Sequence, residues 1–293
     1  MPENAAAIAL TQVPPISLRR RLVDRLMTGV AVATVIIVLA PLIAIFGYLV
    51  YRGIGSLNWA FFTQLPKPVG ETGGGMANAI VGSILILGIA SVIGVPFGIG
   101  AGIYLAEYGR NRFGSAIRFT ADVLNGVPSI VIGIVAYAIV VLYQKHFSAL
   151  AGGVALAIMM VPTISRTTEE MLLLVPQALR EAAYGLGVPR WRTTLSIVLR
   201  TATSGVITGI MLAFARVAGE TAPLLFTAFG NQYWNLQPGQ PTAALPLQIY
   251  VYANSPYDDW HRLAWGGSFV LIILIVGAIS AVRYVVRRGT FGA

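Results

Sequence analysis

Cysteine is absent from this chain of 293 residues, and ionisable side chains of every kind are scarce. The absence of cysteine excludes a disulfide framework, thiol catalysis and a cysteine-based metal site. Histidine occurs only at His146 and His261, which lie far apart at the ends of predicted membrane spans, so we expect no histidine metal site. The sequence also lacks a GxxxxGKS or GxxxxGKT phosphate loop, and the chain is therefore not an ATPase of that type.

Charged residues make up only 11% of the chain, hydrophobic residues make up 56%, and the mean hydropathy is +0.76. This balance is far from that of a soluble domain and typical of a protein that crosses a membrane several times. A helical span requires about 20 apolar residues, so spans take up most of the length. We predict an all-α membrane protein with six transmembrane helices.

The apolar runs divide the chain into predicted spans and their connections. The first run stays uncharged for too long to be a signal peptide, so we expect a retained anchor. The predicted parts are an N-terminal tail at 1–25, a first span at 26–50, a periplasmic loop at 51–75, a transmembrane domain at 76–285 and a C-terminal tail at 286–293. Within that domain we predict spans at 77–105, 121–143, 148–165, 201–228 and 263–282, a polar loop at 166–200 and an aromatic loop at 230–262.

The distribution of positive charge predicts the orientation. Fifteen of the twenty basic residues fall on the predicted side that holds both termini, four fall on the other side, and Arg216 lies within the fifth span. By the positive-inside rule both termini are cytoplasmic. The net charge of +9 does not indicate nucleic acid, because the basic residues cluster beside spans. We expect the lipid bilayer as the surroundings, and a multi-pass protein of the plasma membrane.

Small residues mark one face of the second span. Gly94, Gly98 and Gly102 recur at intervals of four residues, with Pro96 between them. Glycines at this spacing allow a neighbouring helix to approach the backbone closely. We therefore predict a tight helix–helix contact along this face.

The polar loop contains a short helix-forming run from Gln177 to Ala183. Gly185, Gly187 and Pro189 follow it and should end the helix. Arg180, Arg190 and Arg192 flank the run and are expected to keep it at the cytoplasmic face. An ordinary amphipathic loop helix is the alternative to a functional one.

The spacing in this loop resembles the EAA loop of ABC importer permeases. Glu181-Ala182-Ala183 is followed by Gly187, Ile197 and Leu199 at the spacing of that family, with Arg200 in place of its proline. The resemblance implies a type I ABC importer permease fold. It also implies that Glu181, Ala182, Ala183 and Gly187 form a coupling helix that docks into a cleft of a separate ATP-binding subunit. That partner would bind ATP and magnesium, and this chain would hold no cofactor and catalyse no reaction.

Two full charges, Arg216 and Glu220, lie within the fifth predicted span. At a spacing of four residues they would share one helix face and could pair, which lowers the cost of burying either charge. Such residues face the interior of a helix bundle or a wet cavity. One interpretation is a purely structural pair. The other is an anion pathway, in which Arg216 attracts an oxyanion and Glu220 tempers its affinity.

Three uncharged polar residues, Asn125, Ser129 and Thr221, are further candidates for the lining of this pathway. Hydroxyl and amide groups in spans also form ordinary hydrogen bonds between helices, so that alternative stays open.

The run ARVAGETAPLLFT at 215–227 and the run DVLNGVPSIVIG at 122–133 resemble the PstA family of permeases of bacterial phosphate importers. This resemblance covers roughly residues 75–285. It implies a subunit that moves phosphate by alternating access. It implies three partners: a PstC-like permease, a dimer of a PstB-like ATPase and a PstS-like phosphate-binding protein.

Two other functions remain open from the sequence. A permease for another oxyanion, such as molybdate or phosphonate, would keep the EAA loop but should lack the run at 215–227. An ion-coupled secondary transporter would use Glu220 as a proton relay and would work without an ATPase.

Overall fold

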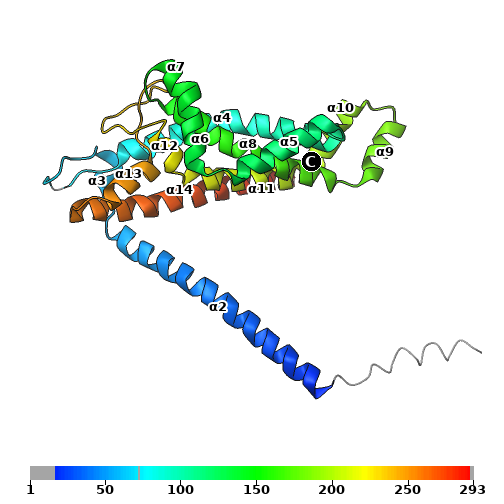
Figure 1. Ribbon diagram of the computed structural model, residues 1–293, viewed down its shortest axis with the longest axis horizontal. Coiled ribbons are helices and arrows are strands. Elements are labelled where there is room, and N and C mark those ends of the chain that lie inside the picture. The colour runs from blue at the N-terminus through cyan, green and yellow to red at the C-terminus, as the bar shows by residue number, and fades with distance from the viewer. Residues whose placement is uncertain (1–16, 72, 291–293) are drawn as a thin grey trace, which may run out of the picture. The chain divides into compact units, whose positions relative to one another are not determined.

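The computed structural model describes residues 17–71 and 73–290, with only the backbone described for 287–290. Parts of the predicted tails, residues 1–16 and 291–293, lie outside the described residues. The described residues form helices joined by loops (Figure 1). Within the described ranges, five helices are long and apolar enough to cross a membrane, and a bent helix pair is a candidate for a sixth span. The predicted all-α class is confirmed.

The chain divides into two compact units, Met1–Tyr51 and Arg52–Ala293, and each is described by itself. Helix α2 (Leu18–Ile54) provides the described part of the first unit. It begins at Leu18, so the arginines that we predicted in a tail lie on its first turns. Pro41 lies inside this helix without ending it, as membrane helices tolerate.

The second unit contains the remaining helices, including two π-helical turns labelled η1 and η2. Helix α10, turn η2 and helix α11 follow one another without a gap and together form one candidate span. The elements are α3 (Trp59–Thr63), α4 (Ala77–Glu107), α5 (Arg112–Gly126), α6 (Ser129–Ala136), η1 (Tyr137–Val141), α7 (Leu142–Gln144), α8 (Ala149–Leu173), α9 (Gln177–Gly185), α10 (Arg190–Thr193), η2 (Thr194–Val198), α11 (Leu199–Ala218), α12 (Ala222–Leu225), α13 (Leu245–Ala253) and α14 (Asp258–Thr290).

The glycine face of α4 packs against α8. A Cβ atom added to Gly98 would lie 2.6 Å from Cβ of Ile164, and one added to Gly102 would lie 2.5 Å from Cβ of Thr168. The contact therefore requires glycine at both positions, and the predicted tight helix contact is confirmed. Because the residue numbers increase together along both helices, α4 and α8 run parallel.

Helix α11 packs against another face of α8 in the opposite direction. Gly205 of α11 meets Met171, and Gly209 meets Thr167, so the residue numbers on the two helices run against each other. Helix α8 therefore contacts both α4 and α11, and α4 and α11 also contact each other. The core around it is formed by buried apolar side chains that include Ile86, Leu156, Met160, Ile164 and Val217.

The third predicted span is broken rather than continuous. Helix α5 ends at Gly126, α6 begins at Ser129, and the chain bends by 109° between α5 and the run Ser129–Gln144. Pro128 has no N–H group for a helix, and it favours an extended conformation of the preceding Val127, which has φ −72° and ψ 134°. The start of the predicted span at 121–143 therefore contains the bend between α5 and α6.

The fifth predicted span ends earlier than expected. Helix α11 stops at Ala218, and Gly219 follows with φ −96° and ψ 0°. A separate short helix, α12, then begins just before Pro223. The predicted aromatic loop at 230–262 also contains helix α13, which packs on α14.

We expect Gly102→Ala to lower the free energy of unfolding by about 1–3 kcal/mol, because the added methyl group collides with Thr168 and with the carbonyl oxygen of Ser165. The measurement is thermal unfolding of the purified protein in detergent. Gly100→Ala on the same helix is the matched control, since nothing lies within 4 Å of a Cβ added there. Equal unfolding midpoints for the two variants would contradict the packing described here.

Candidate functional site

Helix α9 lies beyond the end of α8, at the opposite end of α4 and α8 from α13 (Figure 1). It starts after Pro176 and ends at Gly185, and Gly187 adopts a φ of +76°, which is favourable only for glycine among common residues. The predicted short helix and its glycine stop are confirmed. Its role as a coupling helix stays a prediction.

The two faces of α9 differ in exposure. Ala183 is buried, whereas Glu181 and Ala182 are exposed. The segments before and after α9 also carry large apolar side chains that are exposed in the isolated chain. These are Leu173, Leu174, Leu186, Trp191 and Leu195. Leu173, Trp191 and Leu195 belong to candidate spans, so lipid or another protein would cover them.

A buried ion pair fixes α9 to the end of α4. Arg180 donates to Oε1 of Glu107 at 2.9 Å, and both side chains are less than 10% exposed. Arg180 also donates to the carbonyl oxygens of Val175 at 2.6 Å and Leu172 at 2.8 Å. We predicted Arg180 as a flanking residue of the cytoplasmic face, but it is an internal link. The loss of one partner from such a pair leaves an uncompensated buried charge.

Arg190 extends this link to α10. Its guanidinium group donates to the backbone oxygen of Glu107 at 2.6 Å and lies over the ring of Tyr108, 4.9 Å from the ring centre. The ends of α4 and α8, the helix α9 and the helix α10 are therefore joined by arginine side chains.

A second buried carboxylate, Glu169 of α8, lies at the same end of the molecule. It accepts hydrogen bonds from Arg118 at 2.6 Å and from Arg166 at 3.3 Å. Arg118 also donates to the carbonyl oxygens of Leu105 and Gly109, both at 2.9 Å. Arg166 forms a further ion pair with Asp122 of α5 at 3.4 Å. This network holds α5 and the end of α4 against α8.

The predicted pair of Arg216 and Glu220 does not form in this conformation. Arg216 is exposed on the last turn of α11, and Glu220 lies beyond the end of the helix. No ion pair joins the two among the described residues. The prediction assumed that the helix continues through Glu220, but it ends at Ala218.

The other predicted pathway residues bond to separate partners. The hydroxyl of Thr221 is 3.4 Å from the carbonyl oxygen of Pro246 in the first turn of α13. Asn125, in the last turn of α5, accepts from the hydroxyl of Thr163 at 3.2 Å. Ser129 is the first residue of α6. The described structure joins none of the five predicted pathway residues to another by a hydrogen bond or an ion pair.

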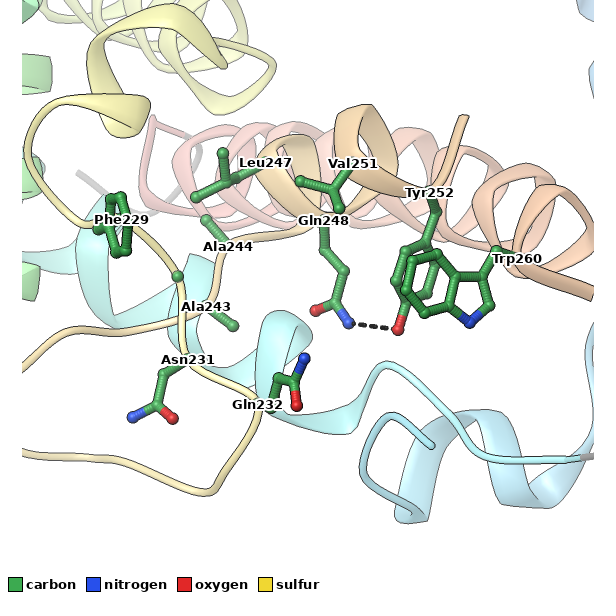
Figure 2. A pocket seen from close by; sticks show the side chains of 11 residues that line it. Phe229, Asn231, Gln232, Ala243, Ala244, Leu247, Gln248, Val251, Tyr252 and Trp260 are labelled. Carbon is green, nitrogen blue, oxygen red and sulfur yellow. Dashed lines mark hydrogen bonds between the residues drawn. The ribbon is translucent and has the colours of Figure 1, made fainter. Parts of the chain in front are cut away.

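A cavity of about 280 Å³ lies at the other end of the second unit, beside α13 (Figure 2). In its lining, Nε2 of Gln248 donates to the hydroxyl of Tyr252 at 3.0 Å. Burial raises the pKa of the Tyr252 phenol, and the hydrogen bond from Gln248 opposes this shift. The residues that line this cavity are uncharged, which makes it poorly suited to an oxyanion.

Comparison with known proteins identifies the family. Residues 98–289 match the family described as "Binding-protein-dependent transport system inner membrane component". A protein of Yersinia pestis named "Phosphate transport system permease protein PstA" is 46% identical over 272 residues, which cover 92% of each chain. The chain belongs to the PstA permease family.

This family membership extends to more distant relatives. A PstA 1 protein of Mycobacterium tuberculosis is 35% identical over 94% of this chain and 93% of its own length. The permease also shares its fold with a solved structure of the MetNI methionine ABC transporter in an inward-facing conformation. That match has a TM-score of 0.55 and 16% identity, and it covers 73% of this chain and 94% of the other. The type I ABC importer permease fold and the multi-pass inner-membrane location are confirmed.

Sequence reasoning missed the buried carboxylates Glu107 and Glu169. Both stand at the ends of apolar runs, and acidic residues are few in this chain. A carboxylate at the end of an apolar run, with arginines nearby in the sequence, was the signal that could have indicated a buried ion pair. Arg166 is only three residues from Glu169. The other two partners could not be read from the sequence, because Arg118 is 51 residues from Glu169 and Arg180 is 73 residues from Glu107.

We expect Glu169→Gln to lower the stability of the permease by about 1–3 kcal/mol, because it leaves Arg118 and Arg166 with a neutral partner. Glu170→Gln is the matched control, since Glu170 is exposed and its side chain is unpaired within the described residues. The measurement is again thermal unfolding in detergent. A loss of stability in both variants alike would argue against a special role of the buried carboxylate.

Proposed function

We infer that this chain is a transmembrane permease subunit of an ATP-driven importer of inorganic phosphate. The observation that carries this inference is the identity of 46% to a PstA phosphate transport permease over 92% of both chains. The structure supplies what such a subunit requires: a bundle of membrane helices and an exposed short helix at one end. The alternative of a permease for another oxyanion is not favoured by these relatives.

ATP hydrolysis in this importer would take place in another subunit. We propose that a PstB-like ATPase dimer binds ATP and magnesium and receives α9 in a cleft, with Glu181 as a polar contact. Exposed Leu186 and Trp191 provide apolar contact area beside it. A PstC-like permease would complete the pathway, and a PstS-like binding protein would deliver phosphate. Both chain termini would lie in the cytoplasm.

The ion pair of Arg180 and Glu107 gives α9 a mechanical connection to the span α4. A displacement of α9 by the ATPase would act on α4 through this pair and on α8 through the carbonyl oxygen of Leu172. Since α4 and α8 pack tightly through glycines, they would move as one body. Alternating access would then arise from the motion of this body against its surroundings.

Arg216 is the proposed contact for the anion. It lies on a face of α11 that is exposed in the isolated chain and unusually polar for a membrane helix, since Thr201, Ser204 and Thr208 are exposed along it at helical spacing. A charged residue at membrane depth requires a wet cavity or a protein partner. We propose that this face meets the partner permease across the phosphate pathway. Glu220, Thr221, Asn125 and Ser129 remain proposed pathway residues.

We expect Arg216→Gln to leave the complex assembled and to reduce phosphate uptake by roughly tenfold or more, because a charge-assisted contact to the anion is lost. The measurement is uptake of labelled phosphate by proteoliposomes that contain the full complex, with ATP on the cytoplasmic side and binding protein on the other. Arg283→Gln, at an exposed arginine of α14, is the matched control. Normal uptake by Arg216→Gln would remove Arg216 from the pathway.

We expect Glu181→Lys to prevent co-purification of the ATPase while the chain still inserts into the membrane. The reversed charge would face the groups on the ATPase that normally contact the carboxylate. Glu71→Lys is the control, because Glu71 is also exposed but lies in the loop before α4, at the other end of that helix. Retention of the ATPase by both variants would contradict the coupling-helix assignment.

Competition separates the remaining alternatives. Uptake of labelled phosphate should be inhibited by unlabelled phosphate and not by molybdate or phosphonate at the same concentration. Transport by the isolated chain without ATP would instead support an ion-coupled carrier, in which Glu220 acts as a proton relay.

A further inference from the structure

A cavity of about 560 Å³ lies beside the base of α9, where the ends of α4 and α8 meet α9 and α10. Three arginines, Arg110, Arg180 and Arg190, line it together with a single carboxylate, Glu107. Leu173 and Leu174 add apolar side chains to its lining, and both are more than half exposed. The cavity is thus both basic and partly apolar.

The charges in the lining do not cancel. Glu107 and Arg180 form an ion pair, with 2.9 Å between Nη2 of Arg180 and Oε1 of Glu107, and their charges neutralise each other. The guanidinium group of Arg180 also donates to the backbone carbonyl oxygens of Val175 and Leu172. Arg110 and Arg190 therefore remain as two positive charges without a negative partner in the lining. An uncompensated pair of guanidinium groups at a cavity attracts an anion.

The guanidinium groups of Arg110 and Arg190 also have N–H donors that no described residue accepts from. Arg190 is held in place by its bond to the Glu107 backbone and by the Tyr108 ring, and only one of its nitrogen atoms is used in these contacts. Arg110 makes no ion pair or hydrogen bond among the described residues. A guanidinium group with unused N–H donors can bind two oxygen atoms of one phosphate group at once.

We propose that this cavity binds a phosphate-bearing anion, which is either the headgroup of an anionic phospholipid or free inorganic phosphate. The site is distinct from the pathway residue Arg216. It rests on the proposed function in placing this end of the molecule at the cytoplasm, beside the ATPase. The bound anion would bridge Arg110, after α4, to Arg190 on α10 and so stiffen the base of the helix that we propose to contact the ATPase.

The absence of cysteine from the chain provides a direct test. Gln177→Cys places a thiol in the lining of the cavity, and Ala178→Cys places one on the next residue of α9, outside the lining. Both positions are exposed. The full complex is reconstituted in nanodiscs of phosphatidylcholine, with or without phosphatidylglycerol, and maleimide labelling of this chain is followed by mass spectrometry.

We expect the anion to slow labelling of Gln177→Cys and to leave Ala178→Cys unchanged. Protection by phosphatidylglycerol identifies a lipid headgroup, and protection by added inorganic phosphate in discs of phosphatidylcholine identifies the free anion. In the Gln177→Cys background, Arg110→Gln should raise the anion concentration required by roughly tenfold, because a charge-assisted contact is lost. Arg112→Gln should not, since Arg112 is exposed, lies two residues away and does not line the cavity.

Four results would overturn the proposal. One is an absence of protection by either anion, and another is equal protection of both cysteines, which would indicate general surface screening. A third is complete protection of Gln177→Cys in phosphatidylcholine alone, which would show that the ATPase fills the cavity. The fourth is full protection in the Arg110→Gln variant. Labelling requires no transport, so its failure is distinguishable from a failure of the phosphate uptake function.

Discussion

The burial of two carboxylates among arginines is the interaction on which one end of this permease depends. Glu107 and Glu169 are each less than 10% exposed, and a buried carboxylate is stable only where charge and hydrogen bonds compensate it. The arginines that compensate them also donate to backbone carbonyl oxygens at the ends of α4 and α8, among them those of Leu105 and Leu172. One set of side chains thus binds the carboxylates and the helix ends together.

This ionic end contrasts with the packing along the rest of the bundle. Contact of α8 with α4 and α11 depends on glycines that let the helices approach closely, and no hydrogen bond or ion pair of the described residues crosses these contacts. The arginine contacts lie at one end instead, where they tie α9 and α10 to the end of α4.

The sequence was most informative where local chemistry decides the outcome. Glycine spacing on α4 predicted a close helix contact along that face, though not that α8 would be the partner, and the glycines after the EAA run predicted the end of α9. Hydropathy was less informative about backbone direction. It averages over a window, so it detected apolar segments near Val127 and Ala218 but not the 109° bend or the helix end that these segments contain.

The sequence by itself determined the class of protein, the number of apolar segments and the family, because these depend on composition and on residue spacing along the chain. The tertiary structure alone decided which charges that are distant in the sequence pair. Arg216 and Glu220, four residues apart, separate because the helix ends between them. Arg180 and Glu107, 73 residues apart, meet because parallel packing of α4 and α8 brings their ends to the same place. Pairing of buried charges depends on distance in space, and only the fold sets that distance.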